Sequence, residues 1–284
     1  MNMRKYSDSN DKHTETMQFD FGENWKNFSR QALNDVRVQA ARGEFEELIA
    51  DIDLAGKSFL EIGFGQGLSL LFATEQGAAC TGCDINEKCL TALEQSRRFF
   101  PALRSTQIQV VIGSILEPQT VHQLRKASSQ GNDTEPGYDV VHSWGVLHHT
   151  GNMDTAIRNA ASLVKTGGHL VIAIYNRHWS SKPWLFIKWL YVKAPRVIRK
   201  ALVLSLYPVI WVAKLAVTSK SPMRQQRGMD FYYNVVDWVG GYPYEYGSRE
   251  EIVAMMLPLG FTLQKFVAAE VPTGCNEFVF KRKA

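Results

Sequence analysis

Three glycines at alternate positions follow an apolar run that contains one acidic residue. The stretch Phe59–Phe72 reads FLEIGFGQGLSLLF, with Glu61 ahead of Gly63, Gly65 and Gly67. An apolar run that stops at glycines and resumes as a helix face predicts a strand, a tight turn and a helix. Such a turn lets a ligand lie against bare backbone at a helix N-terminus. The spacing departs from the dinucleotide fingerprint, because a leucine stands where its third glycine would be.

A carboxylate follows the next predicted strand. Asp84 comes directly after the run Ala79–Cys83. Its two oxygens can accept hydrogen bonds from both hydroxyls of a ribose. The alternative is that Asp84 only caps the predicted helix Glu87–Phe99. The two roles are compatible, and the neighbouring glycine turn favours ribose binding.

Two adjacent histidines follow the fourth predicted strand, Tyr138–His142. They end the segment Ser143–His149, and ligands of open α/β sheets bind at the carboxyl ends of such strands. Imidazole titrates near neutral pH, so His149 and His148 are the candidates for a general base. The alternative is that one caps the following turn and the other packs against the ligand. No metal site is expected, because no cysteine or carboxylate near these residues and His142 completes a zinc set.

The composition indicates a reduced, cytoplasmic α/β protein. A chain of 284 residues can form one large domain with an insertion. Residues 1–18 are polar, lack the apolar core of a signal peptide and predict a disordered lead-in. Cys80 and Cys83 lie in a predicted strand, where residues three apart point to opposite faces, so a functional thiol pair is not expected.

The elements that must position these residues alternate between helix and strand. Helices in Phe19–Ile52, the second of them Glu44–Ile52, precede the first strand. We expect their aromatic residues Trp25 and Phe28 to lie in the core, and the alternative is that they cap the ligand pocket. Serial strand–helix units predict a doubly wound parallel sheet. The remaining elements are strand Gln107–Ile112, polar loop Ser128–Pro136, helix Met153–Val164 with a glycine C-cap, strand His169–Tyr175, a helix capped by Ser248, and strands Phe261–Val267 and Glu277–Lys281.

Together these features resemble the class I S-adenosylmethionine methyltransferases, in particular the broad group related to ubiquinone and menaquinone biosynthesis methylases. The resemblance rests on Glu61-x-Gly63-x-Gly65-x-Gly67, on Asp84, and on the segments YDVVHSWGVLHH and LVKTGGHL. It implies a Rossmann-like sheet of seven strands, mostly parallel, with helices on both faces and the last strand antiparallel. It also implies S-adenosylmethionine as the methyl donor and S-adenosylhomocysteine as the product.

The resemblance extends the set of residues expected at the cofactor. Many members carry an aspartate after the glycine of the third strand, where this chain has Ser114, so backbone contacts would have to substitute. Methyl transfer from a sulfonium depends mainly on alignment and exclusion of water, and a base matters only where the acceptor loses a proton. The further cofactor residues that it implies are Phe64, Ile85, Ser114, Ile115, Ser143 and Trp144.

Residues 176–247 are predicted to form a helical lid that binds substrate, between the core at 19–175 and its closing elements at 248–284. The stretch Thr155–Met229 contains thirteen Lys and Arg and no Asp or Glu, which suggests an anionic partner. Residues 183–218 mix aromatic, aliphatic and basic residues, as an interfacial helix on an anionic membrane does. Their longest uncharged run is shorter than the roughly 20 residues of a spanning helix, so we do not expect them to cross a bilayer. The alternative is a packed lid with a solvated basic face.

The second part of this insertion is rich in tyrosine. Asp230 is expected to cap a short helix that carries Asp237. Tyr232, Tyr233, Tyr242 and Tyr244 are candidates for a substrate-binding wall that stabilises positive charge, and ordinary packing is the alternative.

The function predicted is methyl transfer to a small-molecule or lipid-like acceptor by a cytoplasmic enzyme, peripheral to the membrane. One alternative is a tRNA or RNA methyltransferase, since basic stretches also bind phosphate. No added RNA-binding module supports it, so nucleic acid is not expected as a partner. The other alternative is a non-catalytic, cofactor-binding scaffold at the membrane surface.

Overall fold

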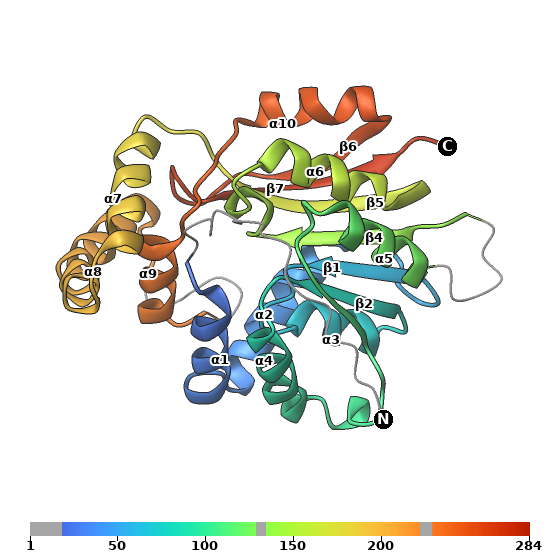
Figure 1. Ribbon diagram of the computed structural model, residues 1–284, viewed down its shortest axis with the longest axis horizontal. Helices are drawn as coiled ribbons and strands as arrows, with labels where there is room; N and C mark the ends of the chain where they lie inside the picture. The colour runs from blue at the N-terminus through green and yellow to red at the C-terminus, as the bar shows by residue number, and fades with distance from the viewer. Residues whose placement is uncertain (1–18, 129–134, 222–228) are drawn as a thin grey trace, which may run out of the picture.

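One seven-stranded sheet organises the computed structural model, which describes residues 19–128, 135–221 and 229–284 (Figure 1). The strand order is β3-β2-β1-β4-β5-β7-β6. The strand β7 runs opposite to the other six, so the mostly parallel sheet with an antiparallel last strand is confirmed. The strands are β1 Ser58–Ile62, β2 Ala79–Asp84, β3 Gln109–Ile112, β4 Tyr138–Trp144, β5 Val164–Tyr175, β6 Phe261–Val267 and β7 Cys275–Arg282.

Helices cover both faces of this sheet because neighbouring strand residues point to opposite sides. Phe59 is buried in the core beneath one set of helices, and Leu60 is buried in the core beneath the other. The first set comprises α2 Asp35–Leu48, α3 Leu68–Glu75 and α4 Lys88–Ser96, and the second comprises α5 Pro118–Ser128, α6 Met153–Ser162 and α10 Arg249–Met256.

Between β5 and α10, the described part of the chain contains three further helices. They are α7 Ser181–Lys193, α8 Arg196–Thr218 and α9 Phe231–Gly240. They pack around a small core of their own, whose most buried members include Phe231 and Val239. The helix α1 (Phe21–Gln31) lies against both α4 and α9 and so joins this group to the sheet (Figure 1).

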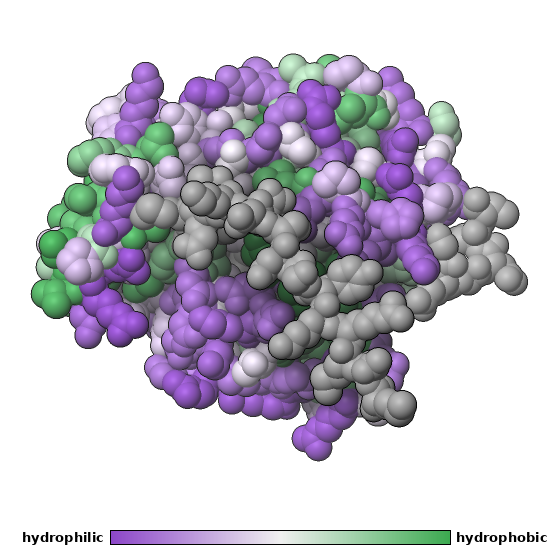
Figure 2. Space-filling model, viewed as in Figure 1, coloured by the Kyte–Doolittle hydropathy of each residue, from purple (hydrophilic) through white to green (hydrophobic). Residues whose placement is uncertain are grey.

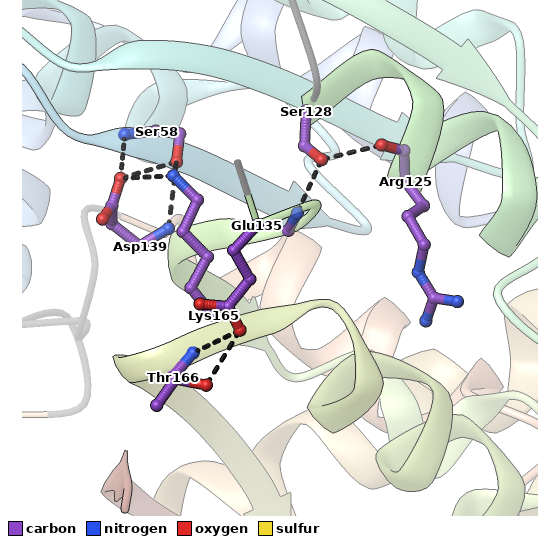
Figure 3. A network of polar contacts seen from close by, with 8 residues as sticks. Ser58, Arg125, Ser128, Glu135, Asp139, Lys165 and Thr166 are labelled. Atoms are coloured by element: carbon purple, nitrogen blue, oxygen red, sulfur yellow. Dashed lines mark hydrogen bonds and ion pairs between the residues drawn. The ribbon is translucent and has the colours of Figure 1, made fainter. Parts of the chain in front are cut away.

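The amino ends of the central strands, opposite the ends expected to bind ligand, are tied by polar contacts (Figure 3). Asp139 accepts hydrogen bonds from the backbone N–H and the hydroxyl of Ser58, at 2.8 and 2.7 Å. Lys165 lies 3.3 Å from the same carboxylate, so β1, β4 and β5 share one polar cluster. Glu135 accepts from the N–H and the hydroxyl of Thr166 nearby.

Several predicted boundaries were wrong. The second helix begins at Asp35 rather than Glu44, because the Asn34 side chain accepts from the N–H of Arg37 and starts it early. The helix predicted for 153–164 ends at Ser162, ahead of the glycine pair. The helix α5 was not predicted, whereas the capping box at Ser248 is confirmed. The predicted lead-in at 1–18 and most of the polar loop, 129–134, lie outside the described residues.

Contrary to the expectation from the sequence, length does not exclude a membrane-spanning segment in residues 183–218, although whether the segment crosses a bilayer stays untested. The helix α8 runs for 23 residues through Pro208 without interruption. Over 18 residues its mean hydropathy is 1.8, so by length and composition alone it could cross a membrane. Only the uncharged run between Lys200 and Lys214, which Pro208 interrupts, entered the expectation from the sequence. The helix includes all three of these residues.

Candidate functional site

A cavity of about 810 Å³ lies at the carboxyl ends of the parallel strands. It extends from the glycine turn after β1 to α8, α9 and the connection between β6 and β7. A volume of this size is typical of ligand sites. The predicted site residues that line it are Glu61, Gly63, Phe64, Gly65, Asp84, Ile85, Ser114, Ile115, Trp144 and His149.

The glycine turn has a backbone that other residues rarely adopt. Gly63, Gly65 and Gly67 have φ angles of 73°, 53° and 75°. A Cβ on Gly63 would lie 2.4 Å from Val146, and one on Gly67 would lie 2.3 Å from Leu93. The turn therefore requires glycine for its backbone and for its packing. Gly67 is the N-cap of α3 and does not line the cavity.

Glu61 fixes the start of the helix that follows the turn. One carboxylate oxygen accepts from the N–H of Leu70 in the first turn of α3, at 3.1 Å. The other lies 3.2 Å from Nδ1 of His142, which is fully buried between Phe45 and Phe59 as expected for a core residue. Glu61 thus positions the start of α3 after the glycine turn, and it also lines the cavity.

Asp84 joins the glycine turn to the end of β2. Its Oδ2 accepts from the N–H of Gly65 at 3.1 Å and its Oδ1 from the N–H of Asn86 at 2.9 Å. Asn86, rather than Asp84, accepts from the N–H of Lys88 at the start of α4. Burial raises the pKa of Asp84, while the two backbone hydrogen bonds oppose that shift. The Asp84 carboxylate therefore lies beside the turn and does not cap α4.

The helix α1 covers this end of the cavity. Trp25 lines the cavity, and its indole lies 3.1 Å from the position that a Cβ of Gly65 would take. Phe28 is fully buried in the core, as expected. Asp20 accepts from Asn86 and forms an ion pair with Lys88, which holds the start of α1 to α4.

The two histidines occupy different environments. His149 lines the cavity, and its Nδ1 lies 2.6 Å from the carbonyl oxygen of Pro243. Only a protonated Nδ1 can donate to a carbonyl, so Nε2 carries the lone pair of the neutral ring. Burial, followed by the charge of Lys188, lowers the pKa of His149 to about 3. His148 is fully buried, does not line the cavity, and accepts from the N–H of Tyr175.

An acidic side chain from the last turns of α9 also faces the cavity. Oδ1 of Asp237 accepts from the amide of Asn24 in α1, at 2.6 Å. Burial raises the pKa of Asp237 to about 7, against the lowering effects of Asn24 and Lys188. Asp230 caps this helix as expected, but a pairing between residues 213 positions apart leaves no local signal in the sequence.

A buried lysine lies behind this part of the cavity wall. The ammonium of Lys188 is fully buried and lies 4.2, 4.7 and 5.7 Å from the ring centres of Trp238, Tyr244 and Tyr175. It donates to the carbonyl oxygen of Trp238. Burial lowers its pKa to about 7, although Asp237 nearby acts in the opposite direction. These three rings form an aromatic box, and their faces attract the ammonium in place of the water that it loses on burial.

The four tyrosines predicted to bind substrate do not line the cavity. Tyr232 is half exposed, and Tyr233 packs on Phe28. Tyr244 is buried in the box around Lys188, and the backbone of Tyr242 bonds to that of Phe19. Ser143 also lies elsewhere, in a hydrogen bond to the carbonyl of Ile62. The aromatic residues that line the cavity near α7 and α9 are Tyr175, Trp184, Phe231 and Trp238.

The thiols near the site are poorly suited to chemistry. Burial raises the pKa values of Cys80 and Cys83 to about 12, so both remain protonated at neutral pH. Among the described residues, no three His, Cys, Asp or Glu side chains are grouped to hold a metal ion.

Residues 36–204 match a family model described as a methyltransferase domain. The chain is 29% identical over 133 residues to the ubiquinone biosynthesis O-methyltransferase of Alkalilimnicola ehrlichii, covering 47% of each. It is 31% identical over 128 residues to that of Vibrio parahaemolyticus, covering 45% of this chain and 48% of the other. The chain thus matches about half the length of these curated relatives.

Two solved structures share the fold. The magnesium protoporphyrin IX methyltransferase of Synechocystis has a TM-score of 0.52 at 15% identity, covering 92% of this chain and 94% of that one. The N-methyltransferase NodS of Bradyrhizobium japonicum has a TM-score of 0.51 at 14% identity, covering 93% and 97%.

Proposed function

This chain belongs to the methyltransferase-domain family, and from that premise we propose that it transfers the methyl group of S-adenosylmethionine to a small-molecule acceptor. One observation carries the proposal. The left-handed glycine turn and Asp84 meet at one end of a cavity whose other end is lined by the lid helices. A cofactor bound at the turn would therefore face an acceptor bound beneath the lid.

The residues at the turn fit an adenosyl ligand. Left-handed glycines expose bare main chain, and the carboxylate of Asp84 offers acceptors to a ribose. The carboxamide oxygen of Gln66 is buried at the cavity without a hydrogen-bond partner among the described residues, so a ligand donor could satisfy it. We assign the ribose to Asp84, and we expect Gly63, Gly65 and Trp25 to enclose the cofactor.

The cofactor supplies an electrophilic methyl group on a positively charged sulfur. The chain's own task is to hold the acceptor atom in line and to exclude water. Where that atom carries a proton, Asp237 is the better acceptor for it. A base is most effective when its pKa lies near the working pH, and Asp237 meets this condition whereas His149, at about 3, does not. We assign His149, which lines the cavity, to contact with the acceptor.

The finer identity of the acceptor is also a proposal. The curated relatives are named as O-methyltransferases of ubiquinone biosynthesis, which supports an aromatic hydroxyl on a lipid-like molecule. The apolar lining of the lid end, including Phe231 and Trp238, supports the same class. We further propose that residues 183–218 contact the membrane surface.

Titration calorimetry with S-adenosylhomocysteine tests the cofactor site. We expect saturable binding by the wild type and at least a tenfold weaker affinity for Asp84→Asn. The matched control is Asp154→Asn, which removes an exposed carboxylate on α6 and should bind as the wild type does. Binding of NADH without binding of S-adenosylhomocysteine would contradict the proposal.

Transfer of labelled methyl from S-adenosylmethionine to a panel of catechols and alkylphenols tests the reaction. Asp237→Asn should lower turnover about 10²- to 10⁴-fold, the usual contribution of a general base, with little change in cofactor affinity. An equal loss in His149→Ala with none in Asp237→Asn would reverse the two assignments. Tight cofactor binding without transfer to any acceptor would favour the scaffold alternative.

A further inference from the structure

The helix α8 separates two different environments. Ile210, Ala213, Lys214 and Val217 line the cavity, at the spacing that places residues on one helical face. Both Ala213 and Val217 are also exposed, so this end of the cavity opens at the molecular surface. The opening lies beside the connection between β6 and β7, whose Val271 and Pro272 line it as well.

The rest of α8 presents an apolar surface outward. Of its 23 residues only Val203 is buried, while Leu204 and Val212 are 69% and 58% exposed. Figure 2 shows hydrophobic residues gathered over α7 and α8, at the left of the view. Other large exposed side chains there are Trp179, Phe186, Trp189, Val197, Ile198, Val209 and Leu215. An exposed apolar surface of this extent marks a contact site.

The charges around this surface favour an anionic bilayer over another protein. Lys182, Lys193, Arg196 and Lys200 are exposed on α7 and α8, and these two helices contain no acidic residue. The ammonium of Lys193 lies 4.3 Å from the ring centre of Trp189, a pairing suited to the membrane interface. Basic residues interleaved with tryptophan and aliphatic side chains are typical of helices that lie in the interface.

The helix is held along the protein rather than released to span a bilayer. Tyr207 packs edge-on against Phe231 of α9 at 4.8 Å, and Val203 is buried in the same small core. Beyond its end, Lys220 forms a 3.0 Å ion pair with Glu270, beside the opening of the cavity. The helix is therefore held to the protein at Val203 and Tyr207, and the chain is held again just beyond its C-terminal end.

We propose that α7 and α8 seat the protein on an anionic bilayer, and that the cavity end at α8 takes the hydrocarbon tail of a lipid-like acceptor that enters from that bilayer. This inference rests on the proposed function, because the tail is taken to belong to the methyl acceptor. The reactive head would then lie between Asp237 and the glycine turn, and the tail would leave past Ala213 and Val217.

Flotation with vesicles tests the membrane contact. We expect the wild type to float with 70:30 phosphatidylcholine:phosphatidylglycerol vesicles and to remain unbound with phosphatidylcholine alone. Leu204→Glu with Val212→Glu should weaken vesicle binding at least tenfold. The control is Val36→Glu, which adds a carboxylate at a residue that is 78% exposed on α2, and it should float as the wild type does. A wild type that does not float, or that is a dimer through this surface, would overturn the proposal.

Binding of propyl and dodecyl gallate, which share a head and differ in tail length, tests the tail site. In the presence of S-adenosylhomocysteine we expect the dodecyl ester to bind about 50-fold more tightly, the gain from burying roughly three of its about nine extra methylenes before the tail leaves the cavity. Ala213→Trp should remove most of this difference while leaving the propyl ester unaffected.

Equal affinities for the two esters, or binding of neither, would overturn the tail site. Calorimetry with S-adenosylhomocysteine on the same samples separates this outcome from failure of the proposed function, because only the latter abolishes cofactor binding.

Discussion

Replacing the buried lysine by methionine should change how the stability of the protein depends on pH. In the folded chain Lys188 has a pKa of about 7, against 10.5 for an ordinary lysine. Between these values the unfolded chain holds a proton that the folded chain has released. The free energy of unfolding therefore rises with pH across this window, by about 1.4 kcal/mol per pH unit.

The magnitude follows from the part of this window that is accessible to experiment. From pH 7.5 to 9.0, the lysine should contribute about 2 kcal/mol of added stability as pH rises. In Lys188→Met the contribution disappears. Loss of the positive charge also raises the pKa of Asp237, so the variant's stability should be flat or fall slightly over the same range.

Urea denaturation at 25 °C across this pH range measures the difference. The control is Lys126→Met, which removes an exposed lysine of α5 and should keep the wild-type slope. Equal slopes for Lys188→Met and the wild type would refute the reasoning, because the buried ammonium would then not titrate between pH 7 and 10.5. At pH 7.5 we expect Lys188→Met to be folded, since an apolar chain of similar length suits the aromatic box.

Other predictions concern single positions in helices. Gly67→Ala should cost more than the roughly 1–2 kcal/mol of a left-handed alanine, because its methyl group would meet Leu93, and calorimetry should show weaker binding of S-adenosylhomocysteine. Gly43→Ala, in the interior of α2 with open space around it, should instead stabilise by about 0.5–1 kcal/mol in urea denaturation. Ser248→Ala should cost about 1 kcal/mol by the same measurement, since it removes the acceptor for the N–H of Glu251.

The parts of the fold that were predicted correctly depend on neighbouring residues. The glycine turn after β1 is confirmed by three positive φ angles, and β6 has the bounds that its apolar pattern predicted. The error at Asp35 arose because the Asn34 side chain caps the helix start. The error at Ser162 arose because β5 already begins at Val164, ahead of the glycine pair. Propensity could not reveal that Pro208 lies inside a continuous helix.

The part of the cavity near α7 and α9 could not be predicted, because it depends on contacts between distant segments. Lys188 is one of thirteen basic residues in the stretch Thr155–Met229, and no local pattern marks it as buried. Its burial depends on the packing of α7 on α9. The four tyrosines predicted to bind substrate do not line the cavity, and Trp184 and Trp238 line it instead. The cavity-facing carboxyl of Asp237 likewise depends on α1.

The helix α1 and the residue before it contact both ends of the cavity. Asp20 anchors it at Lys88, beside the adenosyl end, while Asn24 holds Asp237 at the opposite end. An outward swing of α9 would break the second contact and loosen the first, and such coupling acts equally in both directions. We therefore expect the release of the two products to be coupled through one turn of α1. Stopped-flow release of S-adenosylhomocysteine should accordingly accelerate in Asn24→Ala, and an unchanged rate would show that the two compartments empty independently.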